Sequence, residues 1–415
     1  MVVKTVDSAR ISPPIHAGRC RDPRIDATLD VLRHRFGEQP VLVRQPAADP
    51  VCPQNGDLDI IVFGQVRELL PERLTGLTEH LLQVDVIHLP QVLLSDPDTL
   101  ARQGVLAHRI LTSQPLSQAG PDLAAQLERM HNLMYVVDVQ KERITGFLQL
   151  GADTVREVGV TRDLPELALF WLHMSYVAAL VSLADSQRIL CPNIYTRPFD
   201  FVDPLQKALT MNLRSPALEL LRLNADPTPL PAILRRLHQQ VSETFPEPTW
   251  PEAMRQCTRY EYRYFSSQEE IEWRIRIAEE LIAGGQPEAA VFYLRFVAYM
   301  LARIPMVFHR AREGLDVSFI RPQRAVYPDL ERHCPQILDD LREALGGGEP
   351  VSSSHLNAAV SFVNSLRRKC LEKLQQQNIH LTGIEQWQPY CEPLDRHSPP
   401  NISASFHKEN CHGYP

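Results

Sequence analysis

Apolar residues in the first hundred positions follow alternating helical and strand-like patterns. Their spacing over 25–36 is that of one helix face, which predicts an amphipathic helix that ends at Gly37. Between residues 66 and 82 the spacing is again helical, and we expect this helix to break at Pro71 because proline lacks an N–H group. Short runs rich in branched apolar residues predict strands at 41–43, 58–63 and 84–89. This order of elements predicts a small α/β or α+β sheet domain.

Helical spacing dominates after residue 120, where apolar stripes are opposed by polar faces. The predicted helical segments are 122–149, 164–188, 203–223, 229–244, 267–283, 286–304 and 328–345. Gly284, Gly285 and Pro287 separate two of these segments as a helical hairpin with a short loop. The whole pattern predicts an α+β fold, in which a small mixed β-sheet domain is followed by a mostly α-helical bundle domain.

Stretches rich in glycine, proline and serine divide the chain. Gly346–Pro350, followed by three serines, predicts a flexible linker, and an amphipathic helical pattern comes after it. The end of the chain is polar and rich in Pro, Ser, His and Asn, so we expect it to be disordered. The predicted organisation is a loose leader at 1–24, a sheet domain at 25–115, a helical domain at 120–345, a linker at 346–354, a helix at 355–377 and a tail at 378–415.

Composition limits the class of protein and its partners. The 415 residues are 44% hydrophobic and 22% charged with a net charge of -7, which excludes global disorder. The slight acidity argues against nucleic acid as the main partner, because binding a phosphate backbone requires a basic excess. Eight cysteines without a Cys-x-x-Cys pair predict reduced thiols and a cytoplasmic location.

The most apolar stretch, Leu167–Ala184, is long enough to suggest a membrane span. It contains His173 and Ser175 and is bracketed by Glu166 and Asp185, so we interpret it as a buried bundle helix. The first 24 residues mix charges with prolines and have no apolar core, which argues against a signal peptide. We therefore expect no membrane partner.

Two short motifs place three carboxylates on neighbouring predicted strands. Asp57 and Asp59 are two positions apart, so on a strand both side chains point to the same face, and Asp85 lies in a later strand. Neighbouring strands are about 4.8 Å apart, so the three carboxylates converge if the register allows it. Three such anions repel one another unless a divalent cation is bound, and their oxygen ligands suit Mg²⁺ or Mn²⁺. The structural alternative is that Asp57 caps the turn at Asn55 and Gly56.

The order of these elements resembles the nucleotidyltransferase fold of the DNA-polymerase-β-like superfamily, and the helical remainder resembles its minimal, kanamycin-nucleotidyltransferase-like branch. The motifs cover about residues 25–115, and the rest is similar only in architecture. The resemblance implies that Asp57 and Asp59 coordinate metal ions that carry a nucleoside triphosphate. It implies that Asp85 binds the second metal and is the general base toward the acceptor hydroxyl. It further implies a short strand at Gly104–Leu111.

The chain departs from this family at the end of the first strand. The family has a Gly-Ser pair there, whose N–H groups and hydroxyl hold the nucleotide phosphates. This chain has Gln45 and Pro46 instead, which remove the close backbone approach of glycine and one N–H donor. We expect Arg44, Gln45 and the turn at Asn55 and Gly56 to contact the phosphates in its place.

These features lead to three hypotheses. The first is a metal-dependent nucleotidyltransferase that moves a nucleoside monophosphate from a triphosphate such as ATP to a hydroxyl of a small-molecule or protein acceptor and releases pyrophosphate. The alternative is a catalytically degenerate protein of the same fold that binds a ligand or acts as a scaffold. The third, an RNA-modifying enzyme, rests on the aromatic and basic run Arg259–Phe265, which could instead dock a loop on the helices. A homodimer remains open, since members of the resembled branch can place acceptor residues across a dimer.

Histidine and cysteine residues give no metal motif. The tail contains Cys391, His397, His407, Cys411 and His412, but these lack the tight paired spacing of zinc ligands. Four further histidines lie in helical patterns, and we interpret them as ordinary helix residues; they are His131, His173, His309 and His355.

Overall fold

The computed structural model describes most of the chain as two compact units. Unit 1 comprises residues 1–100 and 107–131, and unit 2 comprises residues 101–106 and 132–415. The described residues are 23–44, 58–66, 70–74, 84–116, 121–161, 164–191, 199, 202–257, 265–314, 326–346, 351–377, 379 and 381. The predicted leader before residue 23, the linker residues 347–350 and all but residues 379 and 381 of the tail lie outside this part. The predicted boundary at 115–120 falls within unit 1.

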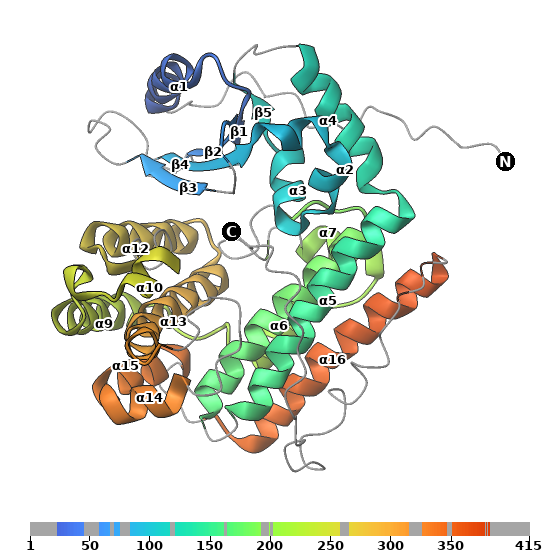
Figure 1. Ribbon diagram of the computed structural model, residues 1–415. Helices are drawn as coiled ribbons and strands as arrows, with labels where there is room; N and C mark the ends of the chain where they lie inside the picture. The colour runs from blue at the N-terminus through green and yellow to red at the C-terminus, as the bar shows by residue number, and fades with distance from the viewer. Residues whose placement is uncertain are drawn as a thin grey trace. The chain divides into compact units, whose positions relative to one another are not determined.

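Unit 1 is built around a mixed sheet of five strands (Figure 1). The strands are β1 (Val41–Arg44), β2 (Leu58–Gly64), β3 (Leu70–Leu74), β4 (Val84–Pro90) and β5 (Gln114–Pro115), in the spatial order β3-β4-β2-β1-β5. β2 and β4 are parallel, and the other three pairings are antiparallel. The fold is therefore α+β, as predicted, with a mostly helical chain and one small mixed sheet.

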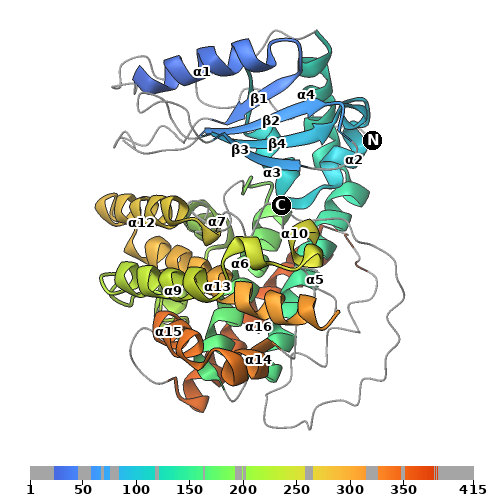
Figure 2. The same cartoon turned by 60° about the vertical axis from the view of Figure 1, so that its left-hand side comes forward.

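Helix α1 (Pro23–Phe36) covers one face of this sheet, and Figure 2 shows it running along the strands. Leu29, Leu32 and Phe36 of α1 are buried in one cluster with alternate residues of three strands. The strand residues of that cluster are Val41, Val43, Leu58, Ile60, Val62, Val84 and Val86. The helical spacing over 25–36 and the strand alternation therefore meet in one core, which confirms both predictions.

Two elements predicted before residue 115 are wrong. Within the helix predicted over 66–82, the structure has strand β3, with Pro71 paired to Ile87 of β4. Proline is disfavoured inside a helix but tolerated in an edge strand, and β3 is the edge of the sheet. Residues 67–69 and 75–83 lie outside the described part. The strand implied at Gly104–Leu111 is helix α3, whose buried Leu106, Ala107 and Ile110 follow helical rather than alternating spacing.

The remaining elements are helical. They are η2 (Gln91–Ser95), α2 (Pro97–Arg102), α3 (Gly104–Leu111), α4 (Pro121–Met134), α5 (Val137–Val160), α6 (Pro165–Ser186), α7 (Val202–Leu209), α8 (Arg214–Leu220), α9 (Leu230–Thr244), η3 (Glu247–Thr249), α10 (Glu252–Cys257), α12 (Gln268–Ala283), α13 (Pro287–Arg312), α14 (Val326–His333), α15 (Pro335–Gly346) and α16 (Ser353–Gln376). Three predicted helical segments are each divided in two. Between α14 and α15 the division is at Cys334, and Pro335 begins the new helix. Between α7 and α8 it contains Thr210, whose φ of 53° is not helical.

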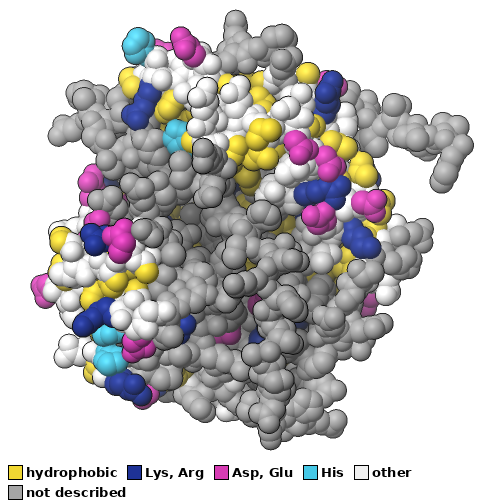
Figure 3. Space-filling view, in the orientation of Figure 1, with side chains coloured by type: hydrophobic (Ala, Val, Ile, Leu, Met, Phe, Trp, Pro, Cys, Tyr) yellow, Lys and Arg dark blue, Asp and Glu magenta, His cyan; other side chains and the backbone are white. Residues whose placement is uncertain are grey.

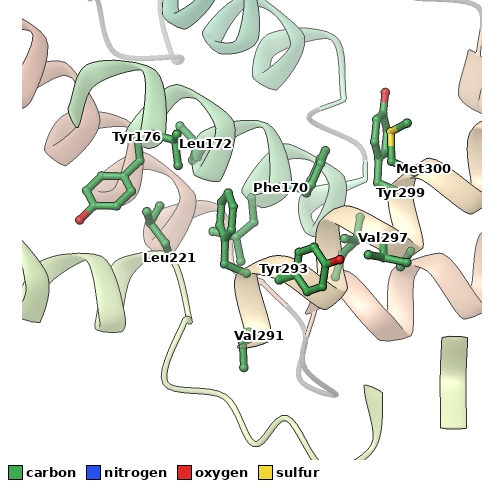
Figure 4. Close-up of a cluster of buried hydrophobic side chains, with 14 of the residues drawn as sticks. Phe170, Leu172, Tyr176, Leu221, Val291, Tyr293, Val297, Tyr299 and Met300 are labelled. Atoms are coloured by element: carbon green, nitrogen blue, oxygen red, sulfur yellow. The ribbon is translucent and has the colours of Figure 1, made fainter. Parts of the chain in front are cut away.

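The core of unit 2 is organised by α6 and α13. α6 is apolar on all sides and packs against α5, α15 and α16 (Figure 1), while α13 packs against α9, α12 and α15. The rings of Phe170 on α6 and Tyr299 on α13 stack at 4.5 Å, within the apolar cluster that Figure 4 shows. Both helices are long and apolar enough to cross a membrane, and 89% of the apolar window of each is buried inside the fold. Because core helices pass the same test, this is weak evidence of membrane insertion.

Candidate functional site

Asp59 and Asp85 lie directly opposite each other on neighbouring parallel strands. Asp59 of β2 is the register partner of Asp85 of β4. The flanking residues Leu58, Ile60 and Val84 are buried beneath α1, so strand alternation directs both carboxylates to the opposite face. Both aspartates are partly exposed there. Two of the three predicted site carboxylates are thus neighbours on one face of the sheet.

Arg44 forms an ion pair with one of these carboxylates. It ends β1 and is the register partner of Asp59, and its Nη2 donates to Asp59 Oδ2. The Arg44 side chain is 14% exposed and the Asp59 side chain 24% exposed, so the ion pair is largely buried. A half-buried guanidinium–carboxylate pair is stronger than a fully exposed one because its charges are less screened. No described residue donates to the other oxygen of Asp59, Oδ1.

The register of the sheet extends to the edge strand β3. In the register of β3 and β4, Arg73 is the partner of Asp85. The strand order therefore gives the sequence Arg73, Asp85, Asp59, Arg44 across the sheet, with two acidic positions flanked by two basic ones.

Four predicted site residues lie outside the described part of the chain. They are Gln45, Asn55, Gly56 and Asp57. The convergence of Asp57 with the other two aspartates and the phosphate contacts of the turn therefore stay predictions. Within the described ranges, no group of three or more His, Cys, Asp or Glu side chains is arranged to hold a metal ion. The donors that are described nevertheless fit Mg²⁺ or Mn²⁺ chemically, because Asp59 and Asp85 supply hard oxygen ligands on one face.

The four helical histidines lie in α4, α6, α13 and α16, as ordinary helix positions. His173 is fully buried and its Nε2 lies 2.6 Å from the carbonyl oxygen of Leu221. Burial, followed by the nearby charge of Arg295, lowers the pKa of His173 to about 3. His355 contacts the carbonyl of Leu220 at 2.9 Å, and the ring of His309 stacks on that of His333 at 4.3 Å.

Sequence reasoning missed the buried charges of unit 2. Arg143 and Asp185 form a fully buried ion pair, and Arg295 is also buried. Burial, followed by repulsion from Arg222, lowers the pKa of Arg295 to about 9. One sequence pattern indicated that Arg143 is buried: it lies four residues from both Val139 and Phe147, inside an apolar helical stripe.

Two further sequence features fall largely outside the described residues. Of the aromatic and basic run Arg259–Phe265, only Phe265 is described; it is buried, with the guanidinium of Arg274 4.3 Å from its ring centroid. This contact is a cation–π interaction that anchors the ring to α12. The cysteines and histidines of the tail are not within the described part.

Comparison with known proteins adds no relative: no protein-family profile, no curated protein sequence and no solved structure matches the chain. The functional argument therefore rests on the residues and register of the sheet.

Proposed function

We propose that the chain is a metal-dependent nucleotidyltransferase with a nucleotidyltransferase-like sheet domain followed by a helical bundle. The observation that carries the proposal is the register of β2 and β4, in which Asp59 and Asp85 are opposite each other on the face away from α1. Two carboxylates side by side on adjacent strands supply hard oxygen ligands of the kind that hold a divalent cation at a phosphoryl-transfer site, which supports the proposal. The helix–strand–strand order of the resemblance adds to this support.

Each site residue has a role in this proposal. Asp57 and Asp59 would hold the cation that accompanies the nucleoside triphosphate, and Asp85 would hold the second cation and accept the proton of the attacking hydroxyl. Bound Mg²⁺ or Mn²⁺ would supply charge stabilisation at the transferring phosphate. Arg44, with Gln45 and the Asn55–Gly56 turn, would orient the triphosphate through charge and hydrogen bonds, so that the acceptor oxygen attacks in line and pyrophosphate leaves.

The acceptor we propose is a small molecule or a protein with a free hydroxyl. The net charge of -7 does not favour a polyanion. Figure 3 shows basic and acidic side chains intermixed on the described surface of the face in view, without a continuous basic stripe there. Cys191, Cys334 and Cys370 are free and buried. Free thiols support our proposal of a cytoplasmic location.

The test compares triphosphate binding and turnover in matched variants. Wild-type protein, Asp59→Asn, Asp85→Asn and the control Asp30→Asn would be titrated with each of the four Mg²⁺–triphosphates by calorimetry. Pyrophosphate release would then be measured with a panel of hydroxyl-bearing acceptors. Asp30 is an exposed acid on α1, paired with Arg33, so its variant tests charge removal alone. We expect release in wild type and Asp30→Asn and its loss in the two site variants; full turnover in Asp59→Asn or Asp85→Asn would contradict the roles assigned.

A second candidate, a binding or scaffold protein of the same fold, is favoured by one observation. Arg44 is engaged by Asp59, and Gln45 and Pro46 follow it where the family has its phosphate cradle. If none of the four Mg²⁺–triphosphates binds, the scaffold is the better assignment. Sedimentation of the full chain would show whether either activity involves a homodimer.

A further inference from the structure

Arg44 occupies the carboxylate to which the proposed function assigns a metal ion. Its Nη2 donates to Asp59 Oδ2, and the two residues are register partners, so the contact is fixed by the pairing of β1 with β2. Arg44 is also the last described residue of β1, immediately before the position of the missing phosphate cradle. Arg44 therefore contacts one aspartate of the acidic pair and directly precedes, in the sequence, the residues to which the proposed function assigns the phosphates.

Because of this contact, we expect the site to bind a free metal ion more weakly than a metal–triphosphate complex. A free divalent cation would have to share Asp59 with a fixed positive charge, and the two cations would repel each other. A triphosphate brings several negative charges, for which a planar guanidinium is a preferred partner. Arg44 can exchange one anion for another, so its charge stays neutralised when it leaves Asp59.

We infer that Arg44 is an exchangeable counter-ion: it is held by Asp59 in the empty site and transfers to the phosphates when a divalent metal–nucleoside triphosphate complex binds. The ligand of this site is therefore the metal–triphosphate complex, and free metal binds weakly. This inference rests on the proposed function and names the form of its substrate. It also assigns Arg44 a double role, as a brake on free metal and as a replacement for the absent Gly-Ser contacts.

The inference requires effects of opposite sign from one substitution. Arg44→Met removes the competing cation, so Mn²⁺ alone should bind more tightly than to wild type. The same change removes the phosphate contact, so Mn²⁺ with a non-hydrolysable triphosphate should bind more weakly. Wild-type metal and triphosphate should favour each other by a factor of about 5–150, and this factor should be smaller in the variant because only the part contributed by Arg44 is lost.

The experiment measures both affinities on the full chain by calorimetry, with free Mn²⁺ checked by electron paramagnetic resonance. Arg33→Met is the matched control, since Arg33 is an exposed arginine of unit 1 paired with Asp30. It should leave both affinities at the wild-type value. Arg44→Lys keeps a point charge and should lie between wild type and Arg44→Met. Thermal unfolding of each variant verifies that it is folded, and Arg44→Gln takes the place of a methionine variant that is not.

The outcomes separate this inference from the proposed function. Mn²⁺ binding that disappears in Asp59→Asn but is the same in Arg44→Met and Arg33→Met overturns the inference and leaves the proposed function standing. A loss of both affinities together in Arg44→Met also overturns it, because Arg44 would then only support the fold of the site. If neither wild type nor any variant binds Mn²⁺ or its triphosphate complex, the proposed function fails and the inference fails with it.

Discussion

The guanidinium of Arg143 binds the carboxylate of Asp185 side-on, with Nε 2.9 Å from Oδ2 and Nη2 2.9 Å from Oδ1. Both side chains are 0% exposed. Nη1 of Arg143 donates to the carbonyl oxygen of Ala101, and Nη2 donates also to that of Met134, each at 2.6 Å. A buried charge pair with this many hydrogen bonds recovers much of the cost of removing its ions from water.

Arg295 is a second buried arginine with a different environment. Among described residues, its guanidinium has one hydrogen bond, 3.3 Å long, to the carbonyl of Leu221, and Nε has no partner. The nearby charge that lowers the pKa of Arg295 is that of Arg222, which is also positive. This cation is therefore buried without a described counter-charge, which is unfavourable.

Replacing each of these two arginines by methionine should have different effects on the free energy of unfolding. Arg143→Met leaves Asp185 charged and buried, so we expect it to lower the free energy of unfolding by about 3–5 kcal/mol. Arg295→Met removes a desolvated charge, so we expect no loss, or a gain of about 1 kcal/mol. Urea unfolding at pH 7 measures both. A loss in Arg295→Met as large as that in Arg143→Met would mean that an anion faces Arg295.

His173 predicts how stability depends on pH. Its pKa is lowered to about 3 in the folded chain, against about 6.5 in an unfolded one. Above pH 6.5 both states are neutral at this residue and it contributes nothing. As pH falls below 6.5 the unfolded chain gains a proton that the folded chain does not, so stability falls, by about 1 kcal/mol at pH 5.5.

The measurement is the difference in unfolding free energy between wild type and His173→Gln at pH 7.5 and 5.5. Gln keeps an N–H donor for the carbonyl of Leu221 but does not titrate. The free energy of unfolding of wild type should fall by about 1 kcal/mol relative to that of the variant at the lower pH. Parallel pH profiles for the two proteins would show that His173 is not the group responsible.

Two neighbouring residues of α1 test its packing on the sheet. Leu32 is fully buried in the core of unit 1, whereas Val31 is 39% exposed. Leu32→Ala should lower the free energy of unfolding by about 2–5 kcal/mol because it leaves a cavity. Val31→Ala should change it by less than about 0.5 kcal/mol. Chemical unfolding followed by circular dichroism would distinguish them, and equal effects would contradict the assignment of the buried face.

Two glycines of α5 test the contact between α5 and α6. A Cβ at Gly151 would lie 3.4 Å from Ala178 Cβ, while a Cβ at Gly159 would meet nothing within 4 Å. Gly151→Leu should therefore cost about 1–3 kcal/mol through overpacking. Gly159→Leu should be neutral or stabilise by up to about 1 kcal/mol, because leucine favours a helix more than glycine does. Thermal unfolding of both variants provides the comparison; a Gly151→Leu protein as stable as wild type would show that this crossing is loose.

The sequence predicted the parts of the fold in which local periodicity and tertiary packing agree. The spacing of α1 and the alternation of β2 and β4 placed Leu32 and Ile60 in a core and Asp59 and Asp85 on one sheet face. Periodicity failed at Pro71, where an edge strand accommodates a residue that a helix excludes. The strand implied by the family resemblance at Gly104–Leu111 was also wrong, because the buried positions there have helical spacing and form α3.

Other features of the site depend on contacts that no local pattern encodes. The ion pair of Arg44 with Asp59 joins residues 15 positions apart and requires the register of β1 on β2, which no local pattern in either strand specifies. Arg143 and Asp185 are 42 positions apart on different helices, so their pairing follows from the packing of α5 against α6. Sequence spacing identifies charged residues in apolar stripes, but it does not identify their partners.

The hydrogen bond from Arg143 to the carbonyl oxygen of Ala101 joins segments that the ribosome makes at different times. The donor, Arg143, is translated 42 residues after Ala101. Asp185, whose carboxylate orients Arg143, is translated another 42 residues later. At about 5–20 residues per second, the peptide at 101–106 emerges several seconds before its binding partners exist. The strands of unit 1, by contrast, are all translated by residue 115. Nascent chains should therefore acquire a protease-resistant sheet first, with 101–106 still open to cleavage until α6 has left the exit tunnel.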